Sequence, residues 1–168
     1  MLRLRPYKKC DAKYILSWIK DEHAFRFWSA DRYDHYPITQ DDMNQHYAGF
    51  DEVDNFFAMT AYDENGVVGH MILRFTDDKK EVLRFGFVIV DDLKRGQGYG
   101  KKMLQLAIHY GFELLKVKKI TLGVFENNVA AYHCYKSVGF KDVILDEYEY
   151  YTIHQERWKC LELELMKE

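Results

Sequence analysis

The segment 95–101, with the sequence RGQGYGK, is the part of the chain best suited to chemistry, because it carries three alternate glycines. Glycine has no Cβ atom and therefore lets the backbone come close to a ligand. An apolar stretch typical of a strand precedes the segment, and an amphipathic stretch typical of a helix follows it. Its amides would then lie at a helix N-terminus without intrahelical partners, where a phosphate or pyrophosphate binds well. The side chains of Arg95 and Lys101 would add positive charge at both ends.

Two common phosphate-binding motifs do not fit this segment. The P-loop motif needs GxxxxGK followed by Ser or Thr, and the dinucleotide fingerprint needs GxGxxG. Here the third glycine comes one residue too early for the fingerprint, and no acidic residue follows at a suitable place. A glycine-rich turn without a ligand is the alternative interpretation. The two flanking cations, the strand before and the helix after favour a binding loop.

The elements around the segment are predicted from the periodicity of apolar residues. A strand over 82–90 precedes it, and its nearly continuous apolar run suggests burial on both faces. The earlier elements are expected to be a strand at 2–6, helices over 11–20 and 39–48, and a hairpin of strands 56–62 and 67–75. The later ones are expected to be a helix over 100–115, a strand at 120–125, a helix over 128–138 and a strand over 158–166. This order predicts one mixed α/β domain with a hairpin-rich first half.

Two motifs resemble those of the GNAT superfamily of N-acetyltransferases. The segment 88–100, VIVDDLKRGQGYG, resembles the acetyl-CoA signature of that family, in which a hydrophobic strand and a short loop lead to Arg/Gln-x-x-Gly-x-Gly/Ala. Further along, the family's N-x-x-A-x-x-x-Y-x-x-x-G-F run is matched by Asn128, Ala131, Tyr135, Gly139 and Phe140. The match is close over 82–140. The first helix and the aromatic segment before Pro37 are similar to the branch that contains ribosomal-protein N-terminal and aminoglycoside acetyltransferases.

The resemblance implies a fold and a domain organisation. The fold would be α/β, with a central mixed, mostly antiparallel sheet of about six to seven strands and about four flanking helices. A V-shaped splay would separate the fourth and fifth strands. A single N-acetyltransferase domain would cover 1–168, with an acceptor-side half at 1–80, an acetyl-CoA-binding core at 81–140 and C-terminal strands at 141–168.

The resemblance also assigns residues to acetyl-CoA, the co-substrate, and implies no metal. The backbone of Val88, Ile89 and Val90 would pair with the pantetheine amides, as a peptide adds to a strand edge. Asn128 would touch the cofactor from the start of the last helix. The pyrophosphate would be held by the amides of Arg95, Gly96, Gln97, Gly98, Tyr99, Gly100 and Lys101.

The implied reaction is direct attack of an amine on the thioester carbonyl. An alkylammonium with a pKa near 10.4 is only about one part in a few thousand neutral at pH 7, so a base or a water chain must first take a proton. A backbone N–H near the end of strand 82–90 could stabilise the carbonyl oxygen as it gains charge. Tyr135 stands where the family places the acid that protonates the departing thiolate. Its position alone would instead suggest a core tyrosine.

The general base is not identified by the sequence. Arg84 and Gly123 stand at the two positions where family members often carry a Glu, so neither assignment carries over. A base recruited through water, or supplied by the substrate, is equally consistent with the sequence. The remaining candidates, each more simply interpreted as a solvated surface residue, are Glu81, His70, Glu126 and Tyr148.

The segment 21–38 is the candidate acceptor side. Its aromatic residues show no clear period, so it is interpreted either as a loop pinned onto the core or as a wall of the cleft. Phe27, Trp28 and Tyr33 are the candidate substrate-binding residues, and the order of the segment before substrate arrives is left open. A peptide N-terminus would want an open aromatic groove, whereas a small-molecule amine such as a polyamine would favour an acidic cleft. Such a cleft could be formed by Asp21, Glu22, Asp31, Asp34, Asp41 and Asp42, although a solvated face is the simpler interpretation.

Composition limits the class of protein. A chain of 168 residues with 48% hydrophobic residues suits one domain with a real core, and a net charge of −3 argues against nucleic acid as a partner. Three cysteines at unrelated spacings indicate reduced thiols. With no signal peptide and no apolar run long enough to cross a membrane, we expect a cytoplasmic protein. A non-catalytic acetyl-CoA sensor is the alternative function, and a homodimer formed through the C-terminal strand is left open.

Overall fold

A single sheet organises the computed structural model, which describes residues 1–168. Its order is β1–β2–β3–β4–β5–β8–β6, with β7 paired to β8 outside this path. All neighbours are antiparallel except β4 and β5, which are parallel. The strands are β1 (Arg3–Pro6), β2 (Phe56–Asp63), β3 (Gly66–Phe75), β4 (Val82–Val90), β5 (Lys119–Phe125), β6 (Lys141–Val143), β7 (Glu149–Ile153) and β8 (Glu156–Met166).

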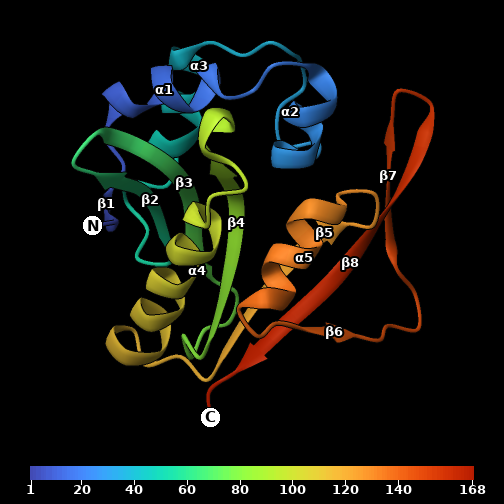
Figure 1. Ribbon diagram of the computed structural model, residues 1–168. Coiled ribbons are helices and arrows are strands. Elements are labelled where there is room, and N and C mark those ends of the chain that lie inside the picture. Colours follow the sequence, from blue (N-terminus) through green and yellow to red (C-terminus); the bar gives the residue numbers. More distant parts are fainter.

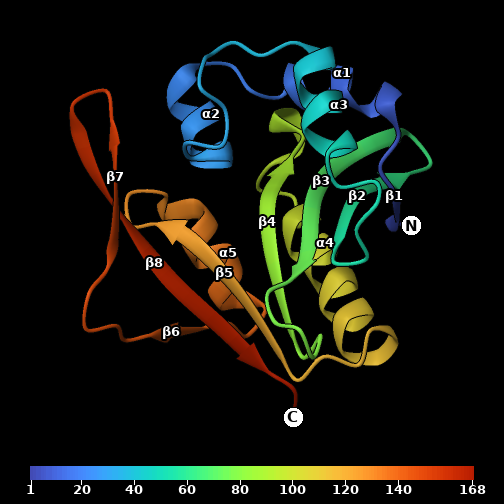
Figure 2. The ribbon, with the colours of Figure 1, turned by 180° about the vertical axis from the view of Figure 1, so that it is seen from behind.

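Five α-helices cover the sheet. They are α1 (Ala12–Ser17), α2 (Glu22–Ser29), α3 (Gln40–Ala48), α4 (Tyr99–His109) and α5 (Val129–Ser137). A π-helical stretch over Tyr110–Leu114 continues α4, and 3₁₀ turns stand at Lys9–Asp11 and Asp92–Lys94. Helices α4 and α5 lie on one face, α1 and α3 lie toward the other, and α2 lies beyond the gap between β4 and β5 (Figures 1 and 2). None of the helices is both long and apolar enough to span a membrane.

The two faces of the sheet bury separate cores. On the α4 and α5 face, Leu83 of β4 and Ile120 of β5 are fully buried together with Leu104 of α4. On the other face, Ile72 of β3 packs with Phe25 and other residues of the first three helices. Burying one such aliphatic side chain contributes about 1.5–3 kcal/mol, so the two cores hold the sheet between its helices.

The predicted fold class and the splay between the fourth and fifth strands are confirmed. The sheet has eight strands rather than six or seven, because β6 and β7, with three and five residues, are too short to show a clear apolar alternation. Strand β4 contributes to both cores, as its apolar run suggested, with Leu83 and Phe85 on one face and Ile89 on the other. Its other residues are only partly buried, because the strand borders an open cleft.

Helix α2 was missed by the sequence prediction. Asp21 caps it by accepting a hydrogen bond from the Ala24 amide at 2.7 Å. The helix buries aromatic residues in two directions. Phe25 packs into the core, whereas Phe27 packs against Trp158 of β8, with 5.1 Å between ring centroids. Ala24, Phe25, Phe27 and Trp28 do follow three- and four-residue spacing. The helix was missed because it has only eight residues and because aromatic residues continue beyond its end without that period.

Candidate functional site

The splay of β4 from β5 is the central feature of the site. The two strands pair only over Val82–Phe85 and Lys119–Leu122, and then diverge (Figures 1 and 2). The remaining part of β4 stays paired with β3 on its other side. Its edge toward β5 therefore carries peptide groups without a strand partner, which an extended ligand could use.

A β-bulge marks the point where the strands separate. Ile72 of β3 faces Gly86 and His70 faces Ile89, so Phe87 and Val88 together oppose one residue of β3. Phe87 has a φ of +47°, a conformation that is unfavourable for a residue with a bulky side chain. The indole N–H of Trp28 in α2 donates to the Phe87 carbonyl at 3.0 Å. Helix α2 thus holds the bulge, and strain of this kind is often found at functional sites.

A cleft of about 1380 Å³ fills the splay. Its walls come from β4 and β5, from α2, from the loop before α4 and from one side of α5. The volume exceeds the roughly 300–1,000 Å³ that is usual for a pocket holding one small ligand. The cleft therefore has room for an extended cofactor and a second substrate.

The glycine segment forms one end of this cleft. Gly96 and Gly98 have φ values of +74° and +85°, and no other heavy atom lies within 4 Å of where a Cβ would stand on either residue. Gly98 is the N-cap of α4, and its carbonyl accepts from the Lys102 amide at 3.1 Å. The amides of residues 99–101 precede that first helical bond and have no intrahelical partner. The open space above them fits a pyrophosphate.

Most of the predicted cofactor residues line the cleft, namely Val88, Ile89, Val90, Arg95, Gly96, Gly98, Gly100, Lys101 and Asn128. Two do not line it. The Gln97 side chain donates back to the Leu93 carbonyl at 3.3 Å, and the Tyr99 hydroxyl donates to Asp63 at 3.3 Å. Only the backbone amides of Gln97 and Tyr99 could take part in binding.

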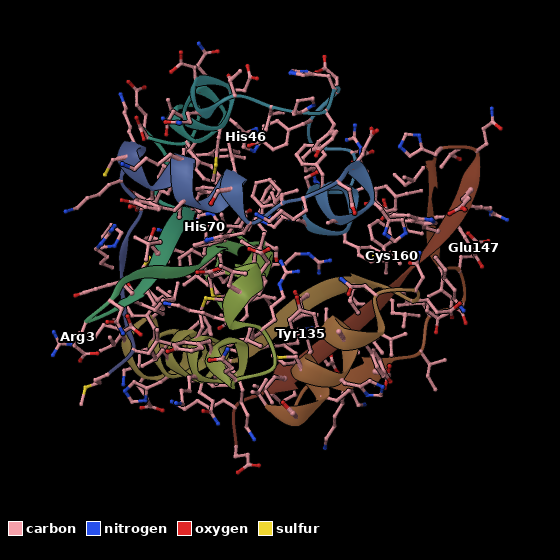
Figure 3. The ribbon with its side chains drawn as sticks, turned by 45° about the horizontal axis from the view of Figure 1, so that its top comes forward. Arg3, His46, His70, Tyr135, Glu147 and Cys160 are labelled. Atoms are coloured by element: carbon pink, nitrogen blue, oxygen red, sulfur yellow. The ribbon has the colours of Figure 1, made fainter.

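Tyr135 enters the cleft from α5 (Figure 3). Its ring lies against Phe140, with 6.3 Å between centroids, and the residue is only 7% exposed. Burial raises the pKa of the Tyr135 hydroxyl well above its ordinary value of 10.0. The hydroxyl is therefore protonated at neutral pH and can donate a hydrogen bond into the cleft.

Comparison with known proteins identifies the family. A family model described as the acetyltransferase (GNAT) family matches residues 13–140, well over half of the chain. The chain belongs to the GNAT family. It is thus an acetyl-CoA-dependent N-acetyltransferase.

Among similar proteins, the spermine/spermidine N(1)-acetyltransferase of Bacillus subtilis (strain 168) is 44% identical over 52 residues, which are 31% of this chain and 34% of that relative. The spermidine N(1)-acetyltransferase of Escherichia coli (strain K12) is 24% identical over 140 residues, covering 83% of this chain and 72% of that one. The solved structure of spermidine N-acetyltransferase from Vibrio cholerae, in complex with CoA and spermine, has a TM-score of 0.83 at 19% identity. The alignment covers 98% of this chain and 95% of that one, and it shows that the two share a fold.

The acetyltransferase carries a neutral histidine in its cleft that no sequence motif marked. His46 of α3 lines the cleft, and its ring centroid lies 5.8 Å from that of Phe87 at the bulge. Burial, and then the charge of Arg32, lower the pKa of His46 below 6.5. Its imidazole is therefore a neutral proton acceptor at pH 7.

The four base candidates from the sequence lie outside the cleft. Glu81 pairs with Lys118 at 2.7 Å, Glu126 pairs with Lys159 at 3.7 Å, and the Lys159 ammonium lies over the Tyr148 ring. The prediction of a solvated position was wrong for His70, which is fully buried and bonded to the Tyr47 hydroxyl at 2.6 Å. The sequence prediction assumed that a histidine would face solvent. Strand β3 is buried on both faces from residue 68 to residue 73, so even a polar side chain there lies in the interior.

The residues at the two family carboxylate positions are packed against each other. The guanidinium of Arg84 lies over Gly123, so that a Cβ on that glycine would stand 2.9 Å from the Arg84 Nη2 atom. Arg84 also forms an ion pair with Glu162 of β8 at 2.6 Å and donates to Thr121 at 3.2 Å. Lack of a side chain at Gly123 thus makes room for an ion pair that crosses β5.

Phe27 and Trp28 line the cleft, whereas Tyr33 does not, because its ring is buried among Phe25, Trp28 and Phe87. The two interpretations of segment 21–38 are both partly right, since α2 forms a wall and the following loop packs onto the core. None of the six carboxylates proposed for an acidic cleft lines it. The structure uses them for helix caps and surface ion pairs at Asp21, Glu22, Asp31, Asp34 and Asp42.

Proposed function

We propose that this acetyltransferase transfers the acetyl group of acetyl-CoA to the primary amine of a small molecule by direct attack. The observation that carries the proposal is the splay of β4 and β5, with peptide groups that have no strand partner along one edge and Tyr135 within the cleft. The relatives named as spermidine and spermine acetyltransferases support a small-molecule amine over a peptide N-terminus.

The residues that would hold the co-substrate follow from the shape of the cleft. Acetyl-CoA supplies the acetyl group as a thioester and leaves as a thiol. The amides of residues 98–101 would bind its pyrophosphate, with the charges of Arg95 and Lys101 beside them. The edge of Val88–Val90, which has no strand partner toward β5, would bind the pantetheine amides. The Asn128 side chain, which makes no capping bond in α5, is free to reach the cofactor.

Three groups of the chain would carry out the chemistry. His46 would take a proton from the acceptor ammonium, directly or through a water molecule, so that the amine nitrogen can attack the carbonyl carbon. A backbone N–H at the bulge would stabilise the negative carbonyl oxygen. Tyr135 would donate a hydrogen bond and then its proton to the sulfur as the carbon–sulfur bond breaks. The acetylated nitrogen would release its second proton to the tyrosinate, which forms the neutral amide and restores the phenol.

Two cysteines also line the cleft, and their protonation supports direct attack. Burial raises the pKa of both the Cys134 and the Cys160 thiols above 9.0. A protonated thiol is a poor nucleophile. These thiols are therefore poorly suited to form an acetyl-cysteine intermediate, and the amine attacks acetyl-CoA directly.

Replacing Gly98 with alanine is expected to raise the Kd for CoA about tenfold. A residue with a Cβ is strained by roughly 1–2 kcal/mol at a left-handed φ, and relieving that strain would turn the amides of the loop away from the pyrophosphate. Calorimetric titration with CoA measures the effect. Gly66→Ala is the matched control, because Gly66 also has a positive φ and open space but lies in the β2–β3 turn. Equal Kd values for the two variants would contradict the assigned role of Gly98.

The proposal is tested by incubating the protein with acetyl-CoA and a panel of amines, with CoA release followed by a thiol reagent. The panel contains amino acids, amino-acid amides, polyamines, aminoglycosides and short peptides, and mass spectrometry identifies the N-acetylated product. Amine-dependent release with a small-molecule product supports the proposal. CoA binding without transfer to any amine would favour a non-catalytic sensor instead, and a preference for peptides would reject the small-molecule acceptor.

A further inference from the structure

Three arginines gather on the acceptor side of the cleft. Arg74 of β3 and Arg84 of β4 are directly opposite each other in the sheet and share the face that α2 borders. Arg32, in the loop after α2, also lines the cleft. Like charges directly opposite each other in a sheet destabilise it. A sheet that keeps such a pair beside a cleft therefore calls for a compensating anion.

Two of these three guanidinium groups have a carboxylate partner within the chain, and the third has none. Arg84 is held by Glu162, and Arg32 by Asp31 at 2.9 Å. The Arg74 guanidinium forms neither an ion pair nor a hydrogen bond within the chain, although the residue is half-buried. Burial, followed by the charges of Arg84 and Arg32, lowers the pKa of Arg74 from its ordinary 12.5. Its charge is thus poorly compensated.

The negative charges in the cleft do not meet this need. Only two carboxylates line it, Glu149 and Glu162. Glu162 accepts two hydrogen bonds from Arg84, at 2.6 and 3.1 Å, and so is already neutralised. A polyamine would bring a second ammonium group close to uncompensated guanidinium groups. Glu149 forms no ion pair, so three guanidinium groups face one carboxylate that is not already paired. The acceptor side therefore carries a net positive charge, opposite to what a polyamine acceptor needs.

Resting on the proposed function, we infer that the acceptor is an amine that also carries a carboxylate, an amino acid or a similar compound, whose carboxylate binds to Arg74. The planar guanidinium fork matches a carboxylate in two parallel hydrogen bonds. Arg74 lies directly opposite Arg84. Gly86, where β4 and β5 begin to separate, is two residues further along β4, which corresponds to roughly 7 Å of strand. A short spacer between amine and carboxylate fits this separation.

The wall beside Arg74 suits a carbon skeleton. Phe56, which pairs with Arg74 across β2 and β3, also lines the cleft and stacks on Phe50 with ring centroids 4.0 Å apart. The carboxylate subsite is therefore polar on the β4 side and apolar on the β2 side, as binding of an amino acid through its main-chain groups and side chain requires.

The test compares each of the standard amino acids with its amide, and adds spermidine and phosphoethanolamine. The inference predicts a kcat/KM at least about tenfold higher for the best amino acid than for its amide, because the amide lacks the charge-assisted pair. In Arg74→Gln this ratio should fall about tenfold, mainly because the KM of the amino acid rises. In Arg74→Lys the ratio should lie between those of the wild type and Arg74→Gln. Arg157→Gln is the control and should keep the wild-type ratio, because Arg157 stacks on Tyr150 outside the cleft.

Binding gives a second readout that does not depend on turnover. The N-acetylated amino acid and its amide are titrated into the protein with saturating CoA, and the acid should bind at least about tenfold more tightly in the wild type but not in Arg74→Gln. Equal binding of acid and amide, or acetylation of amides or spermidine as fast as amino acids, would overturn the inference while leaving the proposed function intact. A preference for phosphoethanolamine would overturn the inferred carboxylate and indicate that Arg74 binds a phosphate group of the acceptor. Selective binding of the acid without any acetylation would reject the proposed function instead.

Discussion

Tyr135→Phe is expected to lower kcat by about a hundredfold or more, because it removes the donor that stabilises and protonates the leaving thiolate. The substitution deletes one hydroxyl and keeps the ring against Phe140, so the fold and the affinity for CoA should change little. A reduction in kcat with little change in the KM for acetyl-CoA indicates loss of an interaction made only in the transition state. Steady-state rates with the best acceptor, together with calorimetric titration of CoA, measure both quantities.

Tyr132→Phe is the matched control for this variant. Tyr132 lies on the same helix, but its hydroxyl donates to Asp142 at 2.9 Å and does not line the cleft. Its loss should leave kcat within about twofold of the wild type. The role assigned to Tyr135 would be rejected if both variants behaved alike, or if Tyr135→Phe lost its activity only through weaker CoA binding.

His46→Gln is the second large effect, with kcat expected to fall about a hundredfold because the cleft loses its neutral proton acceptor. The lowered pKa of His46 also predicts how the activity of the wild type depends on pH. Since the pKa of His46 is lowered from 6.5, more than half of the imidazole is still neutral at pH 6.5, and half-protonation is reached only below that pH. The ratio of wild-type to variant kcat should therefore approach a plateau toward pH 8 and fall to half of that plateau only below pH 6.5. Ionisation of the shared acceptor amine cancels in this ratio.

His109→Gln serves as the control for His46, because His109 is exposed on α4 and does not line the cleft. Rates are measured from pH 5 to 8 with one acceptor and saturating acetyl-CoA. A ratio near one at all pH values would show that proton removal does not depend on His46. A ratio that already fell to half of its plateau above pH 6.5 would assign the titration to another group.

About half of the fold could be predicted from the sequence, because its elements show in the local pattern of apolar residues and glycines. The β2–β3 hairpin, strand β4 and helices α4 and α5 were predicted with nearly their observed bounds, because their apolar residues recur with the period of a strand or a helix. The glycine segment was located by its three alternate glycines. The splay came from a family resemblance carried by segment 88–100 and by the run from Asn128 to Phe140. The distances and contacts in the structure explain what these motifs have in common, namely that they border one cleft.

The acceptor side was not predictable in the same way, because its residues come together only through tertiary structure. His46, Arg74 and Glu162 lie on α3, β3 and β8, and no spacing along the chain connects them. The acidic residues of 21–42 pointed to a cation-binding cleft, yet they are used for caps and surface pairs. The charge that does line the cleft belongs to arginines at ordinary strand positions, which alternation alone would assign to solvent.

The arrangement around Gly123 gives this acetyltransferase a different internal balance of charge from the family pattern. Where carboxylates often stand, Arg84 occupies the space above Gly123 and takes Glu162 as its partner. Two guanidinium groups then face each other across β3 and β4. On the inference drawn above, the residues that replace the usual base candidates would also change which acceptors the cleft favours.

A single-turnover experiment tests the central claim of direct transfer within the splay most directly. Protein in excess over isotope-labelled acetyl-CoA is mixed with or without the best acceptor amine, quenched at short times, and analysed by intact-protein and small-molecule mass spectrometry. Direct transfer predicts one N-acetylated amine per acetyl-CoA consumed, no acetylated protein at any time, and intact acetyl-CoA when the amine is absent. Rapid acetylation of Cys134 or Cys160 before product appears, or consumption of acetyl-CoA without an acetylated amine, would contradict it.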